Sequence, residues 1–245
     1  MRDRMVGPKG GFDRRVTRIV TPGTLIDEPF LNPYENNYLL AVTHSNDSES
    51  ACVGLAWTDV STGDFFTQRT TIQALRDELV RIGPKEIVLD AALKGDQDHA
   101  FHQAINEEGL FVSYAVLQDN TPTDLSPPET TGDDLSLVLK PPMAPGETSL
   151  SDVESNAVQL LTAFMHANLL EHMPHLSSPS RESTAGRMQI DAHTIKALEI
   201  RESMREGGPT GSLFSVVKRT VTSSGTRLLA RWLCEYVAKL TMMAS

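Results

Sequence analysis

Hydrophobic and polar residues alternate with period two in several short stretches of the first half of the chain. The pattern is clearest at Val53, Leu55 and Trp57, whose side chains would share one face of a half-buried strand. Together with the turn that follows, it predicts a β-hairpin over residues 51–68. Short apolar runs predict the remaining strands of this half, at residues 37–43, 86–90 and 111–117.

Between these strands the apolar positions recur every three or four residues, which is the period of a helix packed on a sheet. They predict helices over residues 72–82 and 97–108, with Gly83-Pro84 ending the first of them. Because three strands precede the first helix, we expect an antiparallel meander, with later strands added in parallel through crossover helices. The predicted fold class is α/β with a mixed sheet.

The last third of the chain carries helical periods and no convincing strand. Ser151 and Glu154 have the spacing of a capping box, ahead of a broad apolar face that continues to Pro174. Further helices are predicted over residues 190–204 and from Ser223 onward. This part is expected to be all-α.

Composition separates the two parts and limits the class of protein. Prolines and acidic residues concentrate over residues 119–150, which predicts a mobile linker or a surface insertion. The only cysteines among the 245 residues are Cys52 and Cys234. A secreted disulfide scaffold is therefore excluded and a reducing compartment is expected. No apolar run reaches the roughly 18–20 residues that a membrane span requires, so no membrane partner is expected.

The net charge of −10 argues against a dedicated nucleic-acid-binding protein, because such proteins present a basic surface. Basic residues nevertheless gather over 1–24 and over 207–234, and the second stretch contains no acidic residue. Its cations are the candidate contacts to DNA phosphates: Lys218, Arg219, Arg227 and Arg231. The two last arginines would share one helix face, where they can instead pack their stems and meet carboxylates.

Five short motifs follow one another along the chain, at residues 15–24, 59–63, 84–89, 188–200 and 211–233. Each has a rationale in backbone chemistry: a proline–glycine pair suits a turn, a glycine permits a hairpin reversal, and an aspartate caps a helix. The residues that define them are Pro22, Gly23, Thr24, Asp59, Ser61, Gly63, Asp191, Gly225, Arg227 and Trp232.

In this order the motifs resemble the MutS family of DNA mismatch repair proteins. The first three are similar to parts of its connector domain and the last two to the start of its core, while residues 25–38 resemble the fungal mitochondrial branch. The resemblance implies a basic segment leading into the connector, a ribonuclease H-like connector domain, an acidic Pro-rich linker and the truncated start of a helical core or lever domain. The corresponding residues are 1–24, 25–118, 119–150 and 151–245.

For the whole family, the resemblance implies binding of mismatched double-stranded DNA coupled to ATP and Mg²⁺, a MutS-type dimer partner and docking of a MutL-type protein. The connector would transmit strain between the DNA clamp and the ATPase. This chain contains no P-loop consensus, because the glycines over 207–212 are not followed by lysine. Too few residues precede the first motif for a mismatch-reading domain. We therefore expect part of a longer protein that itself hydrolyses no ATP and carries no catalytic, cofactor-binding or metal-binding residue.

Two other functions remain open. The chain can be a standalone module that docks MutL-type partners, or a ribonuclease H-like nuclease that holds two metal ions. The nuclease needs convergent carboxylates, for which the candidates are Asp59, Asp64, Glu78 and Asp90. The histidines follow no zinc-binding spacing, so a zinc site is not favoured; they include His99, His102, His166, His172 and His175. The resemblance suggests a mitochondrial location, with the nucleus and cytoplasm also open and secretion excluded.

Overall fold

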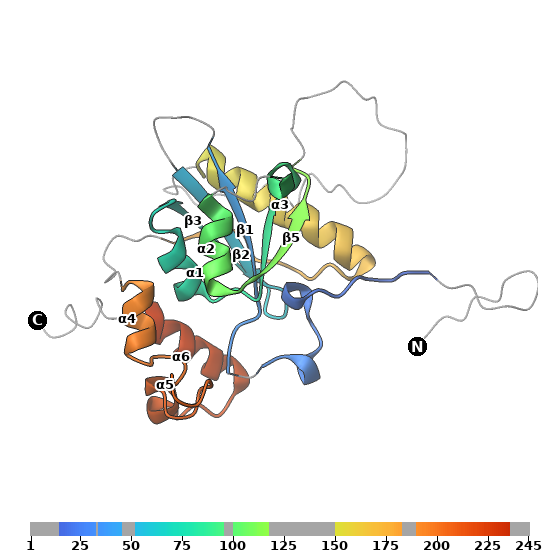
Figure 1. Ribbon diagram of the computed structural model, residues 1–245. Helices are drawn as coiled ribbons and strands as arrows, with labels where there is room; N and C mark the ends of the chain where they lie inside the picture. The colour runs from blue at the N-terminus through green and yellow to red at the C-terminus, as the bar shows by residue number, and fades with distance from the viewer. Residues whose placement is uncertain are drawn as a thin grey trace, which may run out of the picture.

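A six-stranded mixed sheet forms the centre of the molecule (Figure 1). The computed structural model describes residues 15–32, 34–45, 52–95, 100–117, 150–182 and 190–235. The strands of the sheet are β1 (Tyr38–His44), β2 (Cys52–Asp59), β3 (Asp64–Thr71), β4 (Glu86–Asp90), β5 (Phe111–Ala115) and β6 (Ser180–Arg181). Their order across the sheet is β5-β4-β1-β2-β3-β6.

The strand directions confirm the predicted meander. β1, β2 and β3 pair antiparallel, whereas β4 pairs in parallel with β1 and β5 in parallel with β4. At the tip of the β2–β3 hairpin Asp59 stands opposite Asp64. The mixed α/β fold class is therefore confirmed, and the 86–90 strand has the predicted bounds.

Helices cover both faces of the sheet. The described helices are α1 (Leu75–Ile82), α2 (Ala100–Glu108), α3 (Asp152–Leu169), α4 (Ala192–Ala197), α5 (Leu213–Val217) and α6 (Ser223–Glu235), with 3-10 turns η1 (Pro22–Thr24), η2 (Glu28–Phe30), η3 (Ala91–Gly95) and η5 (Leu170–His172). Alternate residues of β1 point to opposite faces. Leu40 packs with α1 and α2, and Leu39 packs with α3. Gly83 ends α1 at φ +66°, as its predicted role requires.

Two elements of the last third differ from the all-α expectation. α3 does not join the later helices, because its apolar face, including Leu160 and Leu161, packs on the sheet. β6 adds a strand beside β3. The physical reason is that β1, β2 and β4 leave an apolar face that needs a cover, and α3 supplies a matching one. We call the six strands, with α1 and α2 on one face and α3 on the other, the sheet unit. Both β5 and α3 belong to it. Residues 119–149 of the predicted linker lie outside the described residues.

Of the remaining helices, α4 and α6 pack against α1, and α5 packs against α6 (Figure 1). Their small core contains Ile195, Ile200 and Cys234 and contacts Val80 of α1. The predicted helix over 190–204 ends early, at Ala197. The chain turns at Glu199, where φ is +49°, so that Ile200 returns to this core. No helix among the described residues is both long and apolar enough to span a bilayer.

Candidate functional site at the junction of sheet and helices

The end of β2 carries a buried aspartate that fixes the hairpin turn. Asp59 is 1% exposed. Its Oδ1 accepts hydrogen bonds from the amide of Ser61, at 3.0 Å, and from the hydroxyl of Ser61, at 2.6 Å. Its Oδ2 accepts one from the amide of Asn37, at 3.1 Å. Gly63 completes the reversal at φ +79°, a conformation that glycine adopts without steric cost. One carboxylate thus joins the start of β1 to the end of β2.

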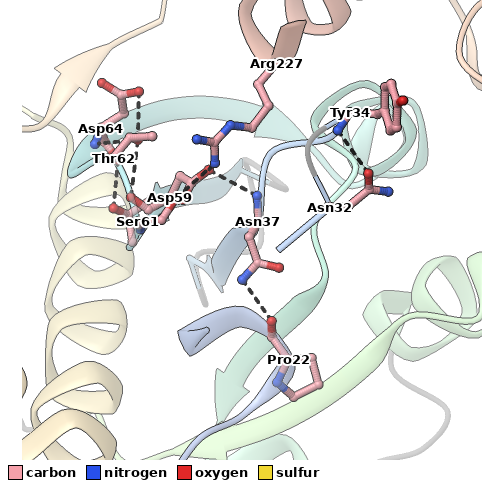
Figure 2. Close-up of polar contacts among 10 residues, drawn as sticks. Pro22, Asn32, Tyr34, Asn37, Asp59, Ser61, Thr62, Asp64 and Arg227 are labelled. Carbon is pink, nitrogen blue, oxygen red and sulfur yellow. Dashed lines mark hydrogen bonds and ion pairs between the residues drawn. The ribbon is translucent and has the colours of Figure 1, made fainter. Parts of the chain in front are cut away.

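The same aspartate also faces helix α6. Arg227 Nη1 lies 3.7 Å from Asp59 Oδ2 and donates a hydrogen bond to Ser61 Oγ at 3.1 Å (Figure 2). The Arg227 side chain is only 12% exposed. A cation removed from water requires a partner of opposite charge, and Asp59 supplies it. Arg227 therefore ties α6 to the tip of the β2–β3 hairpin.

One helical turn further along α6, Arg231 makes a second link to the sheet unit. It pairs with Glu182, which is 7% exposed, and its guanidinium lies over the ring of Phe66, 4.2 Å from the centroid. Glu182 also accepts a hydrogen bond from Arg81 Nη1 at 3.2 Å. Because arginines four residues apart share one helix face, α6 holds the sheet unit at two points. We call the pairs Arg227–Asp59 and Arg231–Glu182 the two junction pairs.

Arg81 connects the Arg231–Glu182 pair to α1 and β3. Arg81 donates to Glu78 Oε2 at 2.6 Å and to Gln68 Oε1 at 2.8 Å, while Gln68 Nε2 donates to Glu78 Oε1 at 2.8 Å. The guanidinium carbon of Arg81 lies 5.7 Å from the ring centroid of Trp57. All of these groups are at least half buried, so the network is protected from screening by salt.

The other two candidate phosphate contacts lie apart from the junction pairs. Lys218 places its ammonium 4.1 Å from the ring centroid of Tyr34. Arg219 is exposed and donates to the carbonyl oxygens of Val216 and Lys218. The four cations therefore do not converge on one surface: Arg227 and Arg231 point to buried carboxylates, and Arg219 faces solvent.

The motif at the N-terminal end of the described chain is joined to the same region. Pro22, Gly23 and Thr24 form η1. The amide of Gly23 donates to Glu86 Oε2 at 2.8 Å, and a Cβ at this glycine would lie 2.6 Å from Leu39 Cδ1. The carbonyl of Pro22 accepts from Asn37 Nδ2 at 2.9 Å, and the amide of Asn37 reaches Asp59 (Figure 2). The first two motifs therefore meet in space.

The later motif residues have structural partners of their own. Asp191 caps α4 by accepting from the amide of Thr194 at 2.7 Å, which confirms the predicted cap. Gly225 lies in the first turn of α6, where its amide donates to Thr222 Oγ1 at 3.1 Å. Trp232 is 48% exposed, so half of this large apolar side chain lies at the surface of α6.

The carboxylates required by the nuclease hypothesis do not converge. Asp59 is occupied by the hairpin amides and Arg227, and Glu78 by Gln68 and Arg81. Asp64 accepts from the hydroxyl of Thr62, and Asp90 accepts from the amide of Ala92. Among the residues that the structure describes, no cluster of three His, Cys, Asp or Glu side chains is placed to hold a metal ion. Those residues include the candidate histidines apart from His99.

Two carboxylates of this region carry little or no signal in the sequence. Glu182 lies in no recognisable motif, and its two arginine partners are far from it along the chain. Glu86 carries a weak signal, because a carboxylate that opens a buried apolar strand must find donors. It finds them in the amide of Gly23 and the hydroxyls of Thr21 and Ser113.

Three carboxylates have lowered pKa values: Glu108 and Glu154 join separate elements, and Asp191 caps α4. Burial raises the pKa of Glu108, but hydrogen bonds from Lys196 and Arg76 outweigh it and bring this pKa below its usual value. Burial likewise raises the pKa of Glu154, and hydrogen bonds from Arg181 and Ser151 bring it below normal. The pKa of Asp191 is lowered by the hydrogen bonds from Thr194. Each group is therefore stabilised in its charged form.

Comparison with known proteins gives consistent matches. Residues 37–177 match the model of MutS domain II, and residues 193–236 match that of MutS domain III. The first range includes α3, in agreement with its place on the sheet.

Curated relatives support the same assignment. The chain is 34% identical over 231 residues to the DNA mismatch repair protein MutS of Bradyrhizobium sp. (strain ORS 278), which is 93% of this chain and 24% of that protein. It is 32% identical over 244 residues to the DNA mismatch repair protein MutS of Nitrobacter hamburgensis, covering 98% of this chain and 26% of the relative. The chain thus spans about a quarter of the length of the curated relatives it matches.

Proposed function

Because the chain belongs to the MutS family of DNA mismatch repair proteins, we propose that it is the connector and early core of such a protein and that its own task is mechanical. It keeps the sheet unit and helix α6 in a fixed relation, so that a movement of the helical part is passed to the β2–β3 hairpin. In the longer protein this links the DNA clamp to the ATPase.

The single observation that carries the proposal is the pair of arginines on α6. Arg227 and Arg231 each hold a buried carboxylate of the sheet unit. Removing one partner of a buried pair leaves an uncompensated charge, which typically costs about 3–5 kcal/mol. A helix held in this way cannot turn or slide without moving both Asp59 and the network around Arg81.

The strand order also supports the finer assignment of the fold. β3-β2-β1-β4-β5, with an antiparallel meander first and parallel strands after it, is the arrangement of a ribonuclease H-like sheet. We propose that α4 to α6 begin the helical core. Because Arg227 compensates the charge of Asp59, this aspartate does not favour the alternative of a metal-dependent nuclease.

Hydrogen exchange tests the mechanical proposal. Arg227→Met keeps the length of the stem and removes the charge, and it should increase amide exchange both in α6 and at Ser61–Gly63. Lys218→Met is the matched control, because Lys218 precedes α6 and contacts Tyr34 rather than the sheet. Faster exchange confined to α6 would contradict the proposal, since the helix would then loosen without affecting the hairpin.

For the longer protein we propose binding of mismatched double-stranded DNA coupled to ATP and Mg²⁺, with a MutS-type dimer partner and a MutL-type protein docking on the connector. The names of the curated relatives support a role in DNA mismatch repair, and the ATP, Mg²⁺ and protein partners rest on the family resemblance. Sequencing the native transcript on both sides, and assaying its product for ATP turnover stimulated by mismatched DNA, tests it. The absence of stimulation in a product that contains a P-loop would contradict it.

A further inference from the structure

A cavity of about 510 Å³ lies between the sheet unit and the helices that follow it. Its sheet side is formed by α1 and the loop Gly83–Lys85, and its helical side by α4 and by the chain that leads into α5. The volume falls within the roughly 300–1,000 Å³ typical of small-molecule sites. Arg231 is the one residue that both lines this cavity and belongs to the two junction pairs.

The walls of the cavity are largely apolar. Val80 of α1 and Leu110, which precedes β5, line the sheet side, while Ile195 of α4 and Phe214 of α5 line the helical side. Apolar walls with a few polar groups are the usual composition of a site for an organic molecule. A flat or elongated apolar body would therefore fit better than a strongly hydrated ion.

The charges that line the cavity are balanced except at Arg201. Lys85 is paired with Glu35 and Lys196 with Glu108, while Arg231 has Glu182. Within the described residues, no carboxylate lies within ion-pair distance of Arg201. The exposed Glu202 also lines the cavity, but solvent screens its charge.

The guanidinium of Arg201 is held in place from one side. Its Nη2 donates to the carbonyl oxygen of Arg81 at 2.7 Å, at the C-terminal end of α1. A Cβ at position 83 would lie 2.5 Å from Arg201 Nη1, so Gly83 leaves the space that the guanidinium occupies. An arginine fixed in this way presents a planar set of donors that matches a carboxylate.

We propose that the cavity binds a small apolar molecule bearing a single carboxylate, with the carboxylate on Arg201 and the apolar body against Val80, Ile195 and Phe214. The site is independent of the mechanical role proposed above. A ligand here contacts α1 and α4 at once, so it also strengthens the contact between the sheet unit and the helices.

Calorimetric titration of the full chain with two ligands of matched shape tests the proposal. Cinnamate carries the carboxylate, and cinnamyl alcohol has the same apolar body without charge. Cinnamate should bind at one site, about tenfold or more tightly than the alcohol, because a charge-assisted hydrogen bond exceeds a neutral one by that factor. Equal affinities, or no saturable binding of cinnamate, would overturn the proposal without requiring any variant to fold.

Three variants then locate the site. Arg201→Gln should abolish the preference for cinnamate and leave the alcohol bound as before. Val80→Phe fills the cavity and should weaken both ligands. Arg205→Gln changes the net charge equally at an exposed arginine outside the cavity lining, and it should change neither affinity. If Arg205→Gln weakened the binding of cinnamate as much as Arg201→Gln does, the binding would come from the overall charge rather than from a specific site, and the proposal would be overturned.

Discussion

At the scale of single residues, buried carboxylates decide the geometry of this molecule. Glu154 is fully buried in α3 and joins two parts of the chain: its Oε2 accepts from the amide of Ser151 at 2.9 Å, and its Oε1 accepts from Arg181 Nε at 2.9 Å. The first contact caps α3 and the second holds β6. A capping residue that is visible from its spacing therefore has a second role that spacing cannot show.

Replacing Glu154 should change how stability depends on pH. Its pKa in the folded chain is lowered from 4.5, so its contribution is present above about pH 4.5 and is lost as the pH falls through the folded value. Glu154→Gln should cost about 2 kcal/mol near neutral pH. The difference from the unmodified chain should shrink toward pH 3. Urea unfolding across this range measures it.

The matched control for this prediction is Glu171→Gln. Glu171 also meets an arginine, Arg15, but both side chains are about 70% exposed. An exposed pair contributes little, so this variant should follow the unmodified chain at every pH. A constant loss for Glu154→Gln over the whole range would mean that packing, rather than charge, sets its effect.

At the scale of elements, β2 and α3 approach each other closely at Gly54. A Cβ on Gly54 would lie 2.1 Å from the carbonyl oxygen of Val153. The same carbonyl accepts from Thr43 Oγ1 at 2.7 Å, so the start of α3 is hydrogen-bonded to the sheet. No side chain can be placed at Gly54 unless the helix moves.

Gly54→Ala should therefore destabilise the chain by about 3 kcal/mol, the upper end for overpacking, because backbone atoms rather than a flexible side chain must shift. Thermal unfolding of the variant measures the loss. Gly95→Ala serves as the control, since a Cβ there meets nothing within 4 Å. A small loss at Gly54 would indicate that α3 can slide on the sheet.

The elements also show which features are predictable from sequence. The strand at 86–90 and the end of α1 at Gly83 follow from local signals, an apolar run and a glycine. The place of α3 does not, because an apolar helix face does not identify the surface that it covers. The early end of α4 depends on Ile200 returning to a core that includes Cys234, and the Arg227–Asp59 pair joins residues that are distant in sequence. Such long-range partners cannot be inferred from spacing.

At the scale of the whole molecule, large apolar side chains are exposed on the helical part. They are Leu198, Met204, Leu213, Val216, Val217, Val221, Leu228 and Trp232. Because contiguous exposed apolar patches mark interaction sites, we expect part of this surface to be covered by another protein surface. This observation agrees with a chain that spans about a quarter of the length of its curated relatives.

The distribution of cations leads to a prediction for DNA. Any binding of duplex DNA at low salt should depend on Lys218 and Arg219 rather than on the arginines of the junction pairs. Replacing both with Gln should lower the affinity and reduce the slope of log affinity against log salt by about 2. Fluorescence anisotropy at several salt concentrations measures this slope.

The two arginines of the junction pairs provide the comparison. Arg227→Gln combined with Arg231→Gln removes the same charge and should leave DNA affinity unchanged while lowering stability, because these side chains face Asp59 and Glu182. If this variant lost as much DNA affinity as the variant at Lys218 and Arg219, the DNA contact would belong to α6 instead.

The attachment of β5 and α3 to one sheet sets how stability depends on the number of residues between them. β5 ends at Ala115 and α3 begins at Asp152, and both pack on the same folded body. Bringing two distant parts of a chain together costs an entropy that grows only with the logarithm of the number of residues between them, and doubling that number costs about 0.6 kcal/mol. Lengthening or shortening the chain between Ala115 and Asp152 should therefore change the stability of this body little.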